Sequence, residues 1–310
     1  MSRIKPRIVV VGSSNTDMIL RVRRLPRPGE TVLGGDFTLA AGGKGANQAV
    51  AAARAGGAVA FIARVGRDIF GDRALAGFRA AGLDIRHVRR DPVLPSGAAL
   101  ICVDARGENQ IAVASGANAA LTPADVRRAA GVFRAARALV MPLETPLAAV
   151  EAAADIASAR GIPILLNPAP ARPLPDRLLR RVSVLTPNAT EAEILTGIRV
   201  AGPASARRAA EALLARGVGA VVLTLGRDGA YLAADALRLH VSGFRVRAVD
   251  TTAAGDVFSG ALAVARAEGR PLEAAVCFAN AAAALSVTKA GAQPSAPARA
   301  RILSFLEGRR

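Results

Sequence analysis

The chain has 310 residues, enough for one large domain or two modest ones, and 52% of them are hydrophobic. Its formal net charge of +17 raises the question of nucleic-acid binding. However, all but three of the 41 basic residues are arginines scattered over predicted outer helix faces, and one tyrosine and no tryptophan leave little to stack on bases. We therefore expect no specific nucleic-acid partner.

Membrane spans and metal sites built on cysteine or histidine are also not expected. No apolar run approaches the roughly 20 residues that a membrane helix needs. Basic residues precede an apolar run at residues 8–11, but this run is too short for a signal peptide. Cys102 and Cys277 are far apart, and His87 and His240 are isolated. The predicted location is a reducing cytoplasm.

A predicted buried strand at residues 7–12 is followed by a polar segment that includes Asn15 and Asp17. No G-x-G-x-x-G sequence follows the strand, so a dinucleotide-binding motif is absent. Polar groups just past a strand's carboxyl end are where α/β proteins bind ligands, although a plain polar turn is the alternative. Residues 18–22 and 31–39 then have strand character, with no helix between them.

A glycine-rich segment at residues 41–48 opens a predicted helix that ends near Gly56. It is not a Walker A loop, because Gly45 follows the lysine where Ser or Thr is required. Glycines at a helix start allow a ligand to approach closely, and Lys44 and Asn47 could then hydrogen-bond a polyol. The alternative is a glycine-rich helix cap with a solvated lysine.

From residue 58 onward, predicted strands and helices alternate. Strands are expected at 58–65, 138–141, 162–166, 182–185 and 220–224, and helices at 72–81, 146–160 and 204–216. This rhythm predicts a three-layer α/β/α domain with a mostly parallel central sheet. Residues 96–103 and 110–114 form a predicted hairpin instead, and can pair with residues 18–40 in a small separate sheet.

This pattern predicts two parts in the chain. Residues 1–14, 42–95 and 115–310 would form the α/β core, and residues 15–41 and 96–114 a β-sheet lid over the site. The exposed face of the lid could also pair with another subunit.

Polar residues recur where the later predicted strands end. Asn188 and Glu191 have the spacing of a capping box at a helix start, so Glu191 is either a simple cap or a group near metal-bound phosphate. Residues 224–229 carry a threonine and glycines, which fit either nucleotide contact or a tight hairpin. One edge of the sheet is therefore the predicted active face.

Residues 250–260 carry the strongest chemical signal. A predicted strand at 246–249 ends in small residues, and a helix begins around Gly255. The small residues, the free N–H groups and the positive end of the helix dipole together form a site for an anion such as phosphate. A carboxylate here, Asp256, repels phosphate unless it has a task such as taking a proton from an attacking hydroxyl. Capping of the helix is the alternative.

Taken together, these segments resemble the ribokinase-like (PfkB) family of carbohydrate kinases, essentially from end to end. The resemblance rests on residues 12–17, 42–49, 116–121, 167–171, 186–188 with Glu191, 250–256 and 291–295. It implies ATP-dependent phosphorylation of D-ribose at its 5-hydroxyl. The alternatives are a kinase for deoxyribose, fructose or adenosine, and a non-catalytic sugar- or nucleic-acid-binding protein on the same fold.

The resemblance also implies roles for individual residues. The sugar would be held by Asn15, Thr16, Asp17, Gly43, Lys44, Gly45, Ala46, Asn47, Glu144 and Asp256. ATP would lie along Asn188, Thr224, Leu225, Gly226, Arg227, Asp228, Gly229, Gly255, Asp256 and Asn280. Asp256 would be the general base, and the backbone of Ala253, Ala254, Gly255 and Asp256 would stabilise the transferring phosphoryl group.

Two cations and a second subunit are implied in the same way. Mg²⁺ would bridge the phosphates, with Asn188 and Glu191 nearby through water. A monovalent cation, K⁺, would take oxygen ligands from Asp250, Thr252, Ser286, Lys289, Gly291 and Ser295. The lid sheets of two subunits would interlock in a homodimer.

Overall fold

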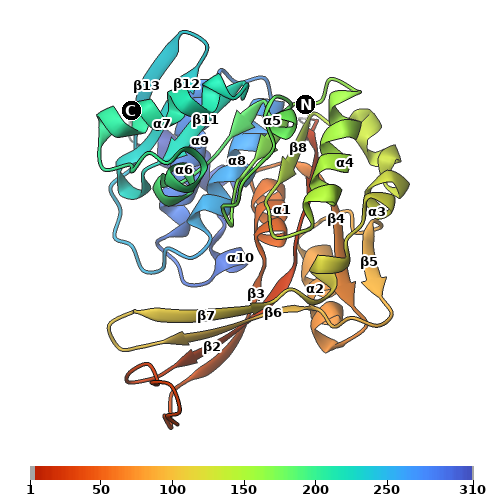
Figure 1. The fold of residues 1–310 in the computed structure, drawn as a ribbon, viewed down its shortest axis with the longest axis vertical. Coiled ribbons are helices and arrows are strands. Elements are labelled where there is room, and N and C mark those ends of the chain that lie inside the picture. The colour runs from red at the N-terminus through yellow and green to blue at the C-terminus, as the bar shows by residue number, and fades with distance from the viewer. Residues whose placement is uncertain (1–3, 309–310) are drawn as a thin grey trace.

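The computed structural model describes residues 4–308. It consists of a large α/β body and a small four-stranded sheet that projects from it (Figure 1). The body holds a nine-stranded sheet in the order β13-β12-β11-β10-β9-β8-β1-β4-β5. These strands are β1 (Arg7–Val11), β4 (Ala58–Gly66), β5 (Val88–Asp91), β8 (Ala138–Met141), β9 (Ile164–Leu166), β10 (Val184–Leu185), β11 (Ala220–Thr224), β12 (Gly229–Ala234) and β13 (Leu237–Ser242). Within residues 4–308, β12 pairs antiparallel with both β11 and β13, and the other neighbouring strands of this sheet are parallel, which confirms the predicted mostly parallel sheet.

Helices cover both faces of this sheet because its strands are apolar on both sides. In β1, Ile8 and Val10 enter one hydrophobic core, and Val9 and Val11 enter the other. The first core is covered by α1 (Lys44–Arg54), α2 (Ile69–Ala80), α8 (Ala254–Ala267), α9 (Leu272–Ser286) and α11 (Arg299–Glu307). The second is covered by α3 (Pro123–Arg128), α4 (Leu147–Ser158), α5 (Asp176–Leu179), α6 (Ala189–Thr196) and α7 (Pro203–Ala215). The three-layer prediction is thus confirmed.

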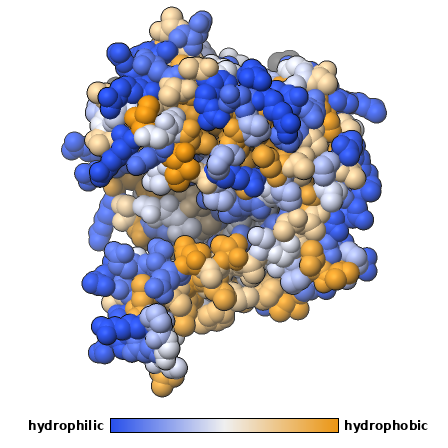
Figure 2. All heavy atoms as spheres, viewed as in Figure 1, coloured by the Kyte–Doolittle hydropathy of each residue, from blue (hydrophilic) through white to orange (hydrophobic). Residues whose placement is uncertain are grey.

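The small sheet has the order β3-β2-β6-β7 and joins the two helix-free segments of the sequence. Its strands are β2 (Asn15–Arg21), β3 (Phe37–Gly42), β6 (Gly97–Val103) and β7 (Asn109–Ala114). β2 runs parallel to β6, and the other two pairs are antiparallel. Figure 2 shows the surface hollowed between this sheet and the body, with hydrophobic side chains gathered on the sheet.

Several local predictions were wrong. Residues 246–249 are not a strand, because the chain leaves the edge of the sheet after β13. The strand predicted at residues 18–22 begins earlier, at Asn15, as β2, which excludes the alternative of a plain polar turn at Asn15 and Asp17. The strand predicted from residue 31 begins only at Phe37, as β3. The helix α11 was missed, since only one of its residues is fully buried and its apolar pattern is weak. No helix within residues 4–308 is long and apolar enough to cross a membrane.

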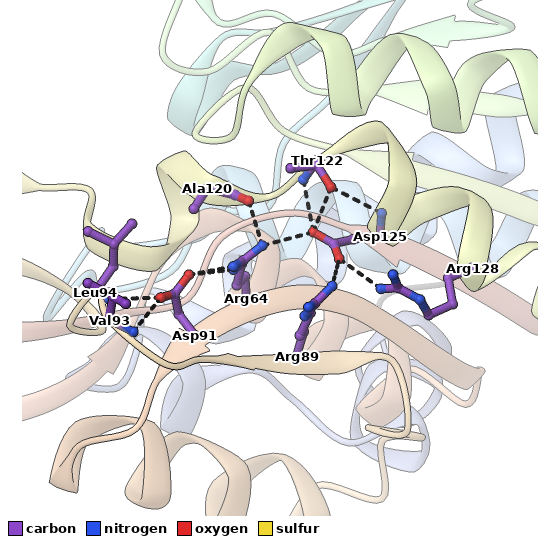
Figure 3. A network of polar contacts seen from close by, with 9 residues as sticks. All are labelled: Arg64, Arg89, Asp91, Val93, Leu94, Ala120, Thr122, Asp125 and Arg128. Carbon is purple, nitrogen blue, oxygen red and sulfur yellow. Dashed lines mark hydrogen bonds and ion pairs between the residues drawn. The ribbon is translucent and has the colours of Figure 1, made fainter.

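Arg64, on β4, lies at the centre of the polar network in Figure 3. Its guanidinium pairs with Asp91 of β5 at 2.6 Å and with Asp125 of α3 at 3.1 Å, and it donates to the carbonyl of Ala120 at 2.9 Å. Burial raises the pKa of Asp125, but hydrogen bonds, that from Arg89 foremost, outweigh it and lower the pKa to about 2. The network therefore ties α3 and the 3-10 helix η1 (Gly116–Ala120) to the sheet edge.

We expect Asp125→Asn to lower the free energy of unfolding by about 2–3 kcal/mol, because Arg64 keeps its charge but loses a nearly buried partner. Urea denaturation at neutral pH measures this loss. Glu211→Gln is the matched control, since Glu211 pairs with Arg207 at the surface, where such pairs contribute less than about 1 kcal/mol. Equal losses in the two variants would contradict a structural role for the network.

Candidate active site

Two adjoining cavities lie at the predicted active edge of the large sheet, beside the start of α8. The smaller is about 340 Å³ and is lined by the body and by β2, β6 and β7 of the small sheet. The larger is about 730 Å³ and is lined by the 3-10 helix η3 (Gly226–Asp228), residues 243–248, α8 and α9. Both cavities touch Thr251, Ala254 and Gly255, so the N-terminus of α8 faces both.

Most of the residues predicted for the sugar lie together around the smaller cavity. Its lining includes Asn15, Asp17, Gly43, Lys44, Asn47, Glu144 and Asp256, as well as Ala253, Thr252, Asn188 and Glu191. Three others lie outside this lining. Thr16 alternates with Asn15 and Asp17 along β2, and Ala46 is fully buried in α1. A Cβ on Gly45 would lie 2.4 Å from the backbone nitrogen of Ser13, so glycine is required for α1 to approach β1 this closely.

Asp256 lies in the first turn of α8 and is 5% exposed. Its carboxylate accepts hydrogen bonds from two amides of α1: Asn47 Nδ2 at 3.0 Å and Gln48 Nε2 at 2.9 Å. The residue before this helix, Ala253, has φ 59 and ψ 14, a left-handed conformation that is strained by about 1 kcal/mol for a side chain with a Cβ. Such strain is typical of functional turns.

Acidic groups crowd around one lysine in the smaller cavity. Burial lowers the pKa of Lys44, but Asp256, Glu144, Glu191 and Asp17 outweigh it and raise that pKa. Burial is also the main reason why the pKa of Asp256 is raised, against the lowering effect of Lys44. The pKa of Asp17 rises to about 6 through burial and the charges of Glu144 and Asp256, again opposed by Lys44. The site therefore holds more negative charge than the lysine balances.

Backbone and glycine geometry place two of these carboxylates. Glu144 Oε2 accepts from the hydroxyl of Ser13 at 2.5 Å and from the backbone N–H of Lys44 at 2.9 Å. A Cβ on Gly42 would lie 2.2 Å from Oδ2 of Asp17, so glycine at this position leaves room for that carboxylate. The two hydrogen bonds of Glu144 join the loop after β8 to the turn after β1 and to the start of α1.

Four residues of the site were not assigned by the sequence: Ser13, Gln48, Asn118 and Asn167. Asn118 of η1 is 2% exposed; it accepts from Ser14 N–H at 2.9 Å and donates to Asn15 Oδ1 at 2.8 Å. It therefore fixes which side of the Asn15 amide carries the acceptor. The family resemblance rests on motifs that include Gln48, Asn118 and Asn167. Each of the three has a hydrogen-bond partner more than 100 positions away in the sequence, so the motifs alone do not reveal these contacts.

The residues predicted for the nucleotide line the larger cavity for the most part. Those in its lining are Thr224, Gly226, Arg227, Asp228, Gly229, Gly255 and Asn280. Leu225 lies outside this lining, and Asn188 and Asp256 line the smaller cavity instead. Asn280 Nδ2 donates to the carbonyls of Val241 and Ser242, which leaves its oxygen facing away from β13. Asn188 and Glu191 form the predicted capping box at the start of α6.

The residues predicted for the monovalent cation come from segments that meet at Asp250. Its carboxylate accepts the N–H of Thr252 at 2.9 Å and the N–H of Gly291 at 2.8 Å. Ser286 and Ser295 donate their hydroxyls to carbonyls three residues earlier in the chain. Lys289 donates its backbone N–H to the carbonyl of Ser286. Among residues 4–308, no group of three or more His, Cys, Asp or Glu side chains is arranged to hold a metal ion.

We expect Asp17→Asn to stabilise the ligand-free protein above pH 6. The native pKa of Asp17, about 6, lies above its ordinary value of 3.8, so the native state binds the proton more tightly and stability falls as pH rises between these values. In urea denaturation at pH 7.5, the free energy of unfolding of the variant should exceed that of wild type by about 1–3 kcal/mol. At pH 4 the two proteins should be equally stable. A variant less stable than wild type at both pH values would contradict this assignment.

Comparisons with known proteins agree with this geometry. The model of the pfkB family carbohydrate kinases matches residues 5–299. The chain is 45% identical over 300 residues to a ribokinase of Haemophilus influenzae, covering 97% of this chain and 98% of that protein. It is 38% identical to a deoxyribokinase of Salmonella typhi, covering 96% of this chain and 98% of that protein.

A solved structure is similar over the same extent. The structure of Arabidopsis thaliana ribokinase complexed with ribose and ATP has a TM-score of 0.91 and 33% identity, and covers 98% of this chain and 99% of that one. Family, fold and sequence therefore agree: the chain belongs to the pfkB family of carbohydrate kinases, enzymes that transfer a phosphoryl group to an alcohol.

Proposed function

We propose that the chain is an ATP-dependent ribokinase, which converts D-ribose and ATP to D-ribose 5-phosphate and ADP. One observation carries the proposal: the start of α8 faces a polar cavity of about 340 Å³ on one side and a cavity of about 730 Å³ on the other. The first would hold the sugar and the second the nucleotide. Asp256, at the boundary, lies where a hydroxyl of the sugar and the γ-phosphate would meet.

In this mechanism, Asp256 takes the proton of the sugar's 5-hydroxyl as the oxygen attacks the γ-phosphorus. The bond from phosphorus to the β–γ bridging oxygen breaks, and ADP leaves. The backbone N–H groups at Ala253, Ala254, Gly255 and Asp256 lie at the positive end of α8 and stabilise the charge on the transferring group. Closure over the cavity excludes water, which would otherwise accept the phosphoryl group.

Sugar binding is supported by an acceptor that the protein itself does not satisfy. Oδ1 of Asn47 is buried in the cavity lining and has no hydrogen-bond donor among residues 4–308, and a sugar hydroxyl would supply one. Asp17 accepts from two neighbouring hydroxyls of the sugar, while Lys44 and Glu144 bind others. The apolar side chains of Ala99 and Ile101 line the same cavity and would contact the sugar ring.

The cations fit the oxygen groups that are present. Mg²⁺ needs few protein ligands when it is bound to phosphates, which agrees with Asn188 and Glu191 as its neighbours through water. When bound, it neutralises charge on the β- and γ-phosphates. The loops at Asp250 and Gly291, joined by a hydrogen bond of 2.8 Å, offer backbone carbonyls and the oxygens of Thr252, Ser286, Lys289 and Ser295 to K⁺.

Residues 15–41 and 96–114 would act as the lid and also form the homodimer contact. The face of this sheet opposite the cavity is apolar: Phe37, Leu39 and Leu100 are 60%, 42% and 58% exposed, with Met18 and Leu20 between them in register. A second copy of this face is the proposed cover. Cys102 lies on β6 and Cys277 on α9, far apart in the sequence, and the proposed location is a reducing cytoplasm.

We expect Asp256→Asn to lower kcat for ribose phosphorylation by about 10³-fold or more, because an amide cannot take the proton of the hydroxyl. The dissociation constant for ribose, measured by calorimetry, should change little, since the shape of the residue is kept. A loss of less than tenfold in kcat would remove Asp256 from the role of base. An equal loss in affinity and kcat would assign it to binding alone.

We expect wild type to be a dimer by light scattering and Leu100→Arg to be a monomer, because a charge in the centre of the apolar lid face prevents its burial. Leu237→Arg is the matched control: Leu237 is 42% exposed on β13 and should leave the mass unchanged. A monomeric wild type, or a dimeric Leu100→Arg protein, would contradict the lid contact.

A further inference from the structure

Gln48 is fully buried beside the proposed base. It lies on α1, one turn beyond Lys44, and its side chain is 0% exposed. Both hydrogens of its amide group are used: Nε2 donates to Asp256 Oδ1 at 2.9 Å and to Asn167 Oδ1 at 3.0 Å. Its own oxygen, Oε1, is buried and accepts no hydrogen bond from the protein within residues 4–308.

The orientation of Gln48 is set by two strand ends. Asn167 follows β9, and its Nδ2 donates to the carbonyl of Thr186, which follows β10, at 3.0 Å. This bond turns Oδ1 of Asn167 toward α1, so Gln48 must present its NH₂ group rather than its oxygen. A chain of hydrogen bonds thus runs from the backbone of the large sheet through Asn167 and Gln48 to Asp256.

Stability alone does not explain this amide. Its buried oxygen has no donor within residues 4–308, and the desolvation of that oxygen offsets part of the stability that the two hydrogen bonds of the NH₂ group contribute. Asp256 is also in the first turn of a helix, where its carboxylate is free to rotate unless both oxygens are held. Asn47 binds Oδ2 and Gln48 binds Oδ1, so the plane of the carboxylate is fixed.

We propose that Gln48, oriented by Asn167, is a positioning residue for Asp256: it holds the carboxylate so that one lone pair faces the sugar hydroxyl. The inference rests on the proposed function, in which Asp256 is the base. Gln48 does not line the cavity, so it acts on the reaction through Asp256 and not on the sugar.

Gln48 also contributes to the charge state of the base. The charged groups around Asp256 are Lys44 on α1, Glu144 after β8, Asp17 on β2 and Glu191 on α6. Burial raises the pKa of Asp256, and Lys44, Asn47 and Gln48 lower it. Loss of the Gln48 donor would therefore raise this pKa, and the acidic limb of the pH–rate profile would move to higher pH.

The test is Gln48→Met, which keeps the length of the side chain and removes both donors. The expected result is a kcat lowered by about 10–100-fold, a KM for ribose within about threefold of wild type, and an acidic limb of kcat/KM at higher pH. The urea midpoint should fall moderately, because Oδ1 of Asn167 and Oδ1 of Asp256 each lose a donor, and removal of the unpaired Gln48 oxygen offsets this only in part. Wild-type kcat and pH profile in this variant would overturn the proposal.

Two further variants keep the test decisive. Gln48→Glu has nearly the shape of glutamine and brings a second acid to Asp256, so it should move the acidic limb further than Gln48→Met does. It also serves if the methionine variant does not fold. In Asp256→Asn protein, Gln48→Met should lower kcat no further, because its effect passes through the carboxylate; an additional tenfold loss would overturn the proposal.

The base and the residue that positions it are tested separately. If Asp256→Asn alone retains wild-type kcat, the proposed base is wrong. If Asp256→Asn is inactive and Gln48→Met is wild type in rate and pH profile, the base stands and the positioning role of Gln48 is wrong.

Discussion

The close crossing of α1 and α8 is the contact on which the site depends. At Gly260 of α8, a Cβ would lie 2.6 Å from the carbonyl oxygen of Gln48 and 2.8 Å from the backbone nitrogen of Ala52, so only glycine permits this distance. Because the helices meet here, the amides of α1 reach the carboxylate at the start of α8. In the proposed function, the helix that binds the sugar thereby also holds the group that would activate it.

The site concentrates features that oppose stability. Buried and half-buried carboxylates surround Lys44, and Ala253 has a left-handed backbone. Asn47 and Gln48 each keep a buried oxygen without a donor from residues 4–308. Elsewhere the same chemistry is balanced, as in the network of Arg64, where each buried acid has a cationic partner. This contrast separates residues retained for chemistry from residues retained for stability.

The sequence predicted the parallel sheet well, because buried apolar runs such as residues 7–11 and 220–224 alternate with helical segments. It also located Asp256 through the small residues before it. It failed where tertiary contacts decide: residues 246–249 were predicted as a strand, yet they leave the sheet, and Val246 and Ala248 line the larger cavity. The contacts of Gln48 were missed because its partners Asn167 and Asp256 lie 119 and 208 residues away.

The central claim is tested most directly by ATP-dependent phosphorylation of ribose, 2-deoxyribose, fructose and adenosine, first in potassium and then in sodium. We expect the highest kcat/KM with ribose and a lower rate when sodium replaces potassium. A higher kcat/KM with another acceptor would contradict the assignment of ribose while keeping the kinase. Folded protein without turnover on any of the four would contradict the proposed function itself.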